Sequence, residues 1–265
     1  MKKIFVLFFV VVAFANCVLA RMNDYEEEIK RTGYKYNAKG FIKAVKQKNL
    51  KAFTYFLHST LGVNIQDSKG IAPIIVAVDD GNFDYTKRLL GESADVNIKT
   101  NLGNSPLYYA IKRKNMEMVK YLVASGADID TQNNKGETPL IHAVKELNGQ
   151  LIYYFVSIGA DINLQDYSGN APLHYAVLLG NLDVVKFLVE NGAGVNCVNN
   201  KNITPLYFAA AYGQEKIVKY LLENSADKYI KTNEGLAPTD IAFKKKYLSI
   251  VNHLSKEAFL NIEPY

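Results

Sequence analysis

Few side chains in this sequence could carry out chemistry, and they are scattered along the chain. The four histidines are each more than thirty residues from the next, so none forms a metal-ligand spacing: His58, His142, His174 and His253. Cys197 has no histidine near it in the sequence, and a lone thiol of this kind is more often inert than nucleophilic. Asp79 and Asp80 are adjacent, and neighbours on a helix point in different directions, so they cannot easily serve one substrate.

The remaining signals for enzymes and nucleic-acid binders are also absent. Glycines recur singly at turn and cap positions along the chain and form no phosphate-binding loop. The formal net charge is +5, and basic residues are spread thinly, which does not favour a nucleic-acid partner. We therefore predict a non-enzymatic protein with no catalytic residue, cofactor, metal or small-molecule substrate.

The dominant feature of the sequence is a strict repeat. Six of the seven prolines follow a step of 33 residues: Pro73, Pro106, Pro139, Pro172, Pro205 and Pro238. Alanines follow the same step from one unit earlier: Ala44, Ala77, Ala110, Ala143, Ala176, Ala209 and Ala242. Such a period indicates one structural unit copied in tandem, in which each copy packs only on its neighbours.

Each copy is predicted to contain two helices and a projecting loop. Ser105 can cap a helix that Pro106 opens, since proline is preferred in a first turn. A second amphipathic helix ends at Gly126, which can take the left-handed conformation. Residues 127–130 are then expected to run extended toward a tight turn at residues 133–136.

These residues resemble the ankyrin repeat, whose unit opens with Thr-Pro-Leu-His and closes with Gly-Ala-Asp-Val-Asn. The best matches are Thr138-Pro139-Leu140, Ala171-Pro172-Leu173-His174 and Thr204-Pro205-Leu206 at the openings, and Gly159-Ala160-Asp161-Ile162-Asn163 at a close. The resemblance implies an all-α solenoid of stacked helix-turn-helix units with β-hairpin loops. It also implies that His174 forms a hydrogen bond that ties neighbouring hairpins.

The expected domains follow from this register. A signal peptide over residues 1–20 and a short lead over residues 21–34 precede an ankyrin domain at residues 35–265. The domain divides into seven units, the first and last acting as caps: 35–67, 68–100, 101–133, 134–166, 167–199, 200–232 and 233–265. Ser93 and Ser225 replace the helix-ending glycine, so these two joints are expected to be soft spots.

The first twenty residues have the layout of a secretory leader. Lys2 and Lys3 precede an apolar run at residues 4–15, and Val18 and Ala20 suit cleavage after Ala20. We therefore expect a secreted or periplasmic protein. The alternatives are an uncleaved membrane anchor and, more weakly, a lipoprotein processed at Cys17. The excess of lysine over arginine resembles the codon bias of an AT-rich, bacterial genome.

The resemblance implies that a protein partner binds on the concave face, at loop tips and at the ends of the first helices. The predicted partner-binding residues are Leu102, Arg113, Lys145, Tyr167, Leu178, Leu179 and Tyr212. Tyr167, Leu178, Leu179 and Tyr212 are expected to form an apolar patch bordered by the two cations, although either leucine could instead pack against the adjoining repeat. The predicted function is that of a monomeric, non-catalytic adaptor. The alternatives are a host-directed effector of an intracellular bacterium, a membrane-anchored periplasmic scaffold, or an enzyme with an unrecognised site.

Overall fold

The computed structural model describes residues 24–255, in which residues 24–31 are helical and are followed by seven helix pairs. The predicted signal peptide, with its cleavage point, lies outside the described residues. The first member of each pair is here called an inner helix: α2 (Ala38–Lys46), α4 (Pro73–Asp79), α6 (Pro106–Lys112), α8 (Pro139–Lys145), α10 (Pro172–Leu178), α12 (Pro205–Ala211) and α14 (Pro238–Lys244). The second is called an outer helix: α3 (Leu50–Leu57), α5 (Phe83–Gly91), α7 (Met116–Ala124), α9 (Gly149–Ser157), α11 (Leu182–Glu190), α13 (Glu215–Glu223) and α15 (Leu248–Ser255).

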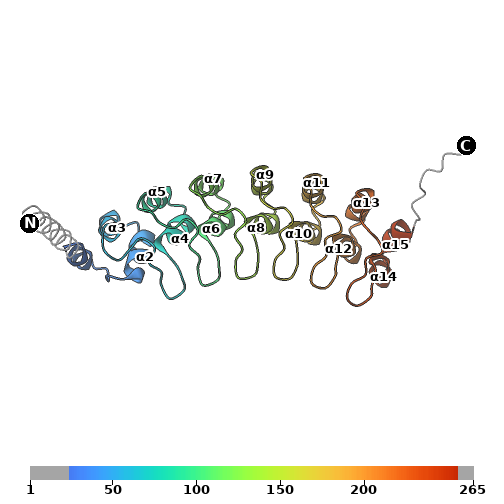
Figure 1. Ribbon diagram of the computed structural model, residues 1–265, viewed down its shortest axis with the longest axis horizontal. Helices are drawn as coiled ribbons and strands as arrows, with labels where there is room; N and C mark the ends of the chain where they lie inside the picture. The colour runs from blue at the N-terminus through green and yellow to red at the C-terminus, as the bar shows by residue number, and fades with distance from the viewer. Residues whose placement is uncertain (1–23, 256–265) are drawn as a thin grey trace, which may run out of the picture. The chain divides into compact units, whose positions relative to one another are not determined.

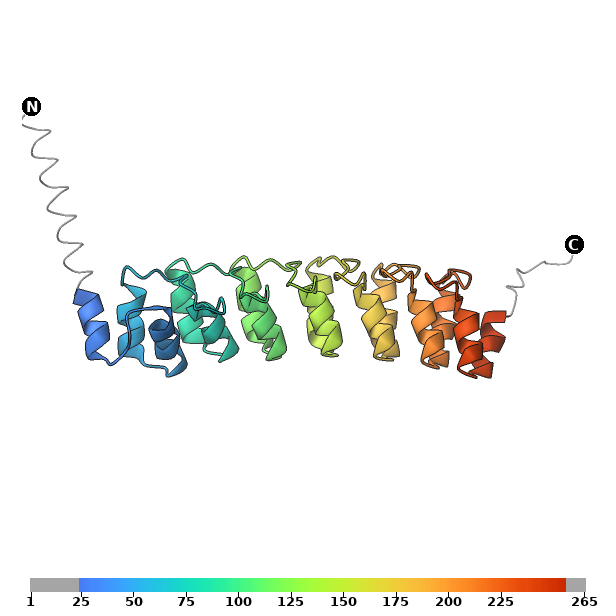
Figure 2. The same cartoon turned by 90° about the horizontal axis from the view of Figure 1, so that it is seen from below.

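The chain divides into two compact units, one ending at Asp128 and the other beginning at Ile129. Within each unit the inner helices lie side by side in one row, and the outer helices form a second row behind them (Figures 1 and 2). In the second unit α8, α10, α12 and α14 pack in sequence, and each also packs on its own outer helix. The apolar core runs between the two rows, where side chains such as Leu173, Val177 and Leu188 are fully buried.

Proline and threonine start the inner helices. Pro139 and Pro205 occupy the first turn of α8 and α12. The hydroxyls of Thr138 and Thr204 each accept the backbone N–H of the third residue of the helix that follows, at 3.2 and 3.1 Å. The expected cap at Ser105 is wrong, because its buried hydroxyl has no hydrogen-bond partner. Alanines stand at the same position before α4 and α10, so a side-chain cap from this position is not required for the helix to begin.

Asparagines start the outer helices, a role that the sequence analysis missed. The side-chain oxygens of Asn82, Asn115, Asn148 and Asn181 each accept a backbone N–H from the first turn, at 3.0 to 3.2 Å. These residues follow the same 33-residue step as the prolines, so the signal was present in the sequence. A side-chain cap of this kind satisfies one of the N–H groups that a helix start leaves unpaired.

Amide side chains also link neighbouring pairs. Asn163 accepts the backbone N–H of Gly194 at 2.8 Å and donates to the carbonyl of Gly192 at 3.1 Å. Asn196 makes the same two bonds to Asp227 and Ser225, at 2.7 and 3.0 Å. Each amide therefore fixes the loop that follows one outer helix against the loop that follows the next.

The expected β-hairpins are tight loops, and no residue between 24 and 255 is in a strand. One such loop is closed by the bond from Thr100 N–H to the Asn104 carbonyl, at 3.0 Å, and by a turn bond from Gly103 N–H, at 2.8 Å. Residues 127–130 were expected to run extended, but the chain instead enters a turn at residue 129. With so few residues on either side of each turn, no ladder of strand hydrogen bonds can form.

The two predicted soft joints have the backbone geometry expected of them. Ser93 and Ser225 both have φ of +65°, in the left-handed region where glycines such as Gly126 stand in other copies. Both serines are exposed. They therefore carry backbone strain that no buried contact of their side chains offsets.

Ser93→Gly and Ser225→Gly should each raise the free energy of unfolding by about 0.5–1 kcal/mol, because glycine takes positive φ without steric cost. Urea denaturation followed by circular dichroism measures the change. Ser157→Gly is the matched control, since Ser157 is an exposed residue inside the last turn of α9 and should show no gain. A loss of stability in both test variants would contradict the strain at these joints.

Candidate functional site

The seven predicted partner-binding residues fall in both units. Leu102 and Arg113 belong to the first unit, where Leu102 stands exposed at the tip of the loop before α6. The other five belong to the second unit: Lys145, Tyr167, Leu178, Leu179 and Tyr212.

Arg113 is held by an acidic residue of the preceding inner helix. Its guanidinium makes two hydrogen bonds to the Asp79 carboxylate, Nε to Oδ1 at 2.8 Å and NH2 to Oδ2 at 3.0 Å. This bidentate pair raises the pKa of Arg113. This pairing joins α4 to the residue that follows α6 and was not predicted from the sequence.

The loop tips of the second unit are fixed by bonds between their backbones. The Tyr167 N–H donates to the Lys135 carbonyl at 2.9 Å, and the Asn200 N–H donates to the Ser168 carbonyl at 3.1 Å. The loops approach so closely that a Cβ on Gly136, whose φ is +76°, would lie 2.5 Å from the Tyr167 nitrogen. The Tyr167 side chain is nonetheless 66% exposed, so a rigid backbone presents it to solvent.

Two apolar side chains stand exposed where inner helices end. Leu179 directly follows α10 and is 43% exposed, and Tyr212 directly follows α12 and is 58% exposed. The Tyr212 ring lies 6.4 Å from that of Phe208, which in turn meets the His174 ring edge-on at 6.0 Å. Leu178 is half-buried. We use the name apolar patch for the three exposed side chains Tyr167, Leu179 and Tyr212; it refers to their shared exposure and not to contact between them.

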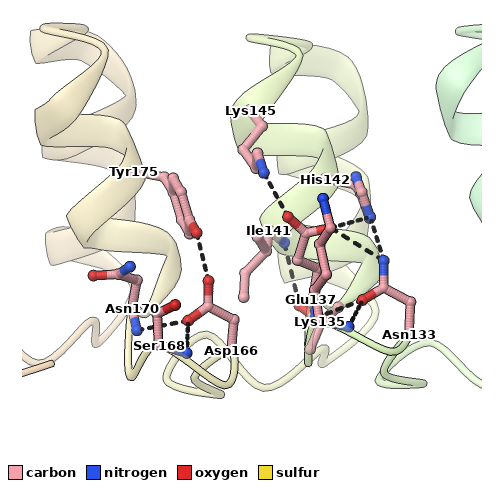
Figure 3. Close-up of polar contacts among 11 residues, drawn as sticks. Asn133, Lys135, Glu137, Ile141, His142, Lys145, Asp166, Ser168, Asn170 and Tyr175 are labelled. Atoms are coloured by element: carbon pink, nitrogen blue, oxygen red, sulfur yellow. Dashed lines mark hydrogen bonds and ion pairs between the residues drawn. The ribbon is translucent and has the colours of Figure 1, made fainter. Parts of the chain in front are cut away.

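Lys145 belongs to a polar cluster around a buried carboxylate (Figure 3). Glu137 is only 6% exposed and contacts the Lys145 Nζ at 2.5 Å, the Asn133 amide at 3.1 Å and the His142 Nε2 at 3.2 Å. Burial acts to raise the pKa of Glu137, but these bonds outweigh it and the pKa is lowered. Lys145 also lies 5.0 Å above the ring of Tyr175. The cation predicted to meet a partner is thus held by the protein itself.

A second carboxylate anchors the next loop in the same way. Asp166 accepts the backbone N–H groups of Ser168 and Asn170, both at 2.9 Å, and the hydroxyl of Tyr175 (Figure 3). Burial, followed by the bond to Asp166, raises the pKa of the Tyr175 hydroxyl. The loop that carries Tyr167 is therefore tied to α10 by side-chain as well as backbone bonds.

Cys197 does have a histidine beside it, contrary to the sequence analysis. Its Sγ lies 3.6 Å from the His174 Nδ1, because the loop after α11 returns to the start of α10. His174 keeps its predicted structural role: Nδ1 accepts the Ala171 N–H at 3.1 Å and Nε2 donates to the Ile203 carbonyl, in the next loop, at 3.0 Å. Burial raises the pKa of Cys197 to about 12, so the thiol stays protonated and unreactive near neutral pH.

Within the described part of the chain, no three histidine, cysteine, aspartate or glutamate side chains are grouped so that they could hold a metal ion. Between residues 24 and 255, no helix has the length and apolar character required for a membrane span. The bonds of the clusters at Glu137 and Asp166 hold each loop in shape and tie it to an inner helix. The arrangement is that of a rigid surface with apolar side chains at its tips and helix ends.

His142 makes stability depend on pH. Burial, opposed by the charge of Glu137, lowers its pKa from 6.5 to about 4, so between these values the unfolded chain binds a proton that the fold does not. This difference in proton binding lowers the free energy of unfolding. The decrease is absent well above pH 6.5, grows as the pH falls and amounts to about 2 kcal/mol at pH 5. When the pH is lowered from 8 to 5, the free energy of unfolding of His142→Gln should therefore fall by about 2 kcal/mol less than that of the wild type.

Urea denaturation at both pH values measures this difference. Glu137 does not interfere, since its carboxylate remains ionised throughout this range, and the other histidines are common to both proteins. Equal losses in the wild type and the variant would show that His142 accepts a proton as easily in the fold as outside it.

Comparison with known proteins agrees with this architecture. A family model described as "Ankyrin repeats (3 copies)" matches residues 41–133, 114–199 and 180–263, which together cover most of the chain. A search of curated proteins finds no match. Ankyrin repeats are protein–protein interaction modules, built as stacked helix pairs. The chain belongs to the ankyrin-repeat family.

Proposed function

We propose that this protein is a non-catalytic adaptor that binds a protein partner through the apolar patch of its second unit. The observation that carries the proposal is the exposure of three apolar side chains on ordered backbone. Tyr167 lies on a loop held by an inter-loop hydrogen bond, and Leu179 and Tyr212 end inner helices, to which their N–H groups are bonded. Aromatic and aliphatic side chains of this kind, ringed by polar groups, form the energetic centre of many interfaces. A surface ordered before binding also loses little conformational entropy when the partner arrives.

The two charged residues predicted to bind the partner, Arg113 and Lys145, are expected to add little to its affinity. Arg113 and Lys145 are already bonded to Asp79 and to Glu137. A partner carboxylate would have to compete with these internal bonds, so it gains little from either cation. Leu102 and Arg113 belong to the first unit, and Leu178 is half-buried, so none of the three is assigned to the apolar patch.

Substituting the apolar patch tests this assignment. Leu179→Asp combined with Tyr212→Ala should weaken binding of the native partner by at least about 30-fold, since loss of one interface anchor commonly costs about 2 kcal/mol or more. The partner is first isolated with the wild-type protein from its own source, and its affinity for each variant is then measured by calorimetry. Far-UV circular dichroism should be unchanged, because both side chains are exposed.

Tyr153→Ala provides the matched control. Tyr153 is a tyrosine of similar exposure, 64%, on the outer helix α9, and its removal should leave the affinity unchanged. Equal affinity of the double variant and the wild type would refute the patch as the binding site. Equal loss in the control would place the interface on the outer helices instead.

We further propose that the protein is exported, on the strength of the leader pattern at residues 1–20. A secreted or periplasmic adaptor and a host-directed effector both require removal of the leader, whereas a membrane-anchored scaffold requires its retention. Mass spectrometry of the protein from its native source should find Arg21 as the first residue. A mature protein that retains residues 1–20 would instead support the anchored scaffold.

A further inference from the structure

The last helix pair exposes a position that every earlier pair buries. Phe243, in α14, is 69% exposed. At the same register position the earlier inner helices carry side chains that are at most 1% exposed: Val45, Val78, Ile111, Val144, Val177 and Ala210. Phenylalanine is also the largest residue at this position, so the exposed apolar area is greater than any earlier pair would leave if it were uncovered.

The outer helix of the last pair has the same feature. Val251, in α15, is half-buried, whereas its register equivalents are at most 2% exposed: Phe53, Thr86, Val119, Ile152, Val185 and Val218. We call Phe243 and Val251, with the exposed lysines at 244–246 beside them, the end face. In the pairs before it, the corresponding side of α12 is covered by α14, and that of α10 by α12.

In these earlier pairs the covering helix is the next one along the chain after the outer helix. Residues 224–237 leave α13 and lead directly to α14, which packs on α12. Residues 256–265 leave α15 at the equivalent point. Ten residues can reach about 33 Å when extended, which is ample for crossing one helix pair.

The composition of residues 256–265 matches the end face. The segment carries the apolar residues Phe259, Leu260 and Ile262, which suit Phe243 and Val251. It also carries Glu257 and Glu263, which outnumber its one cation, Lys256, and suit the three lysines. A second copy of the protein fits this face less well, because a symmetric contact would bring two sets of these lysines together.

We propose that residues 256–265 bind the end face in cis, with Phe259 and its apolar neighbours against Phe243 and Val251, and the two glutamates near the lysines at 244–246. The segment covers the side of the last described pair that the following inner helix covers in the earlier pairs. This inference does not depend on the proposed adaptor function, since the apolar patch and the end face share no residue.

The chain contains no tryptophan, so a single one reports on this contact. In the full chain, Phe259→Trp should emit at a shorter wavelength than Tyr229→Trp and should be quenched severalfold less by acrylamide. Tyr229 is the exposed reference, at 71%. Phe243→Lys, added to Phe259→Trp, should move the emission and the quenching to the values of the reference.

Two controls keep the outcome decisive. Tyr153→Lys, added to Phe259→Trp in place of Phe243→Lys, should change nothing, because Tyr153 lies on α9. Phe243→Ala should give a smaller shift in the same direction as Phe243→Lys, and circular dichroism should confirm that both variants are folded. Emission of Phe259→Trp equal to the reference, or unchanged by both Phe243 variants, would overturn the proposal. So would protection that appears only with dimerisation as the concentration rises, since the end face would then be covered by a second copy.

Discussion

The helix pairs of each unit have apolar surface on their flanks, and this surface is buried where a neighbouring element covers it. A two-helix module alone is too small to form a sufficient core, so its stability depends on the next module. Within the second unit, Val177 and Ala210 are fully buried while Phe243, at the same position in the last described pair, is exposed. Stacking, and not any single pair, therefore makes the core.

Register between neighbouring pairs is set by polar groups, because apolar surfaces alone would allow them to slide. The Asn163 and Asn196 amides each bond to the next loop as both donor and acceptor. The loop tips add backbone bonds, such as that from Tyr167 to Lys135. A shift of one residue would break both kinds of bond at once.

A different set of side-chain bonds determines which charged groups a partner can readily contact. Glu137 and Asp79 engage Lys145 and Arg113, and Asp166 engages Tyr175. The Arg113 charge is thus paired within the first unit and the Lys145 charge within the second, while Tyr167, Leu179 and Tyr212 remain exposed. The proposed binding site therefore relies on apolar contact more than on these two charges.

The sequence by itself determined the fold, because the spacing of Pro139, Pro172 and Pro205 repeats a whole structural unit without slippage. It also located the strained joints at Ser93 and Ser225, since a helix end with positive φ normally requires glycine. Only the tertiary structure decided which side chains pair across repeats. The contact between Cys197 and His174, and the pairing of Arg113 with Asp79, join residues far apart in the sequence, and their geometry depends on how closely the loops and helices approach.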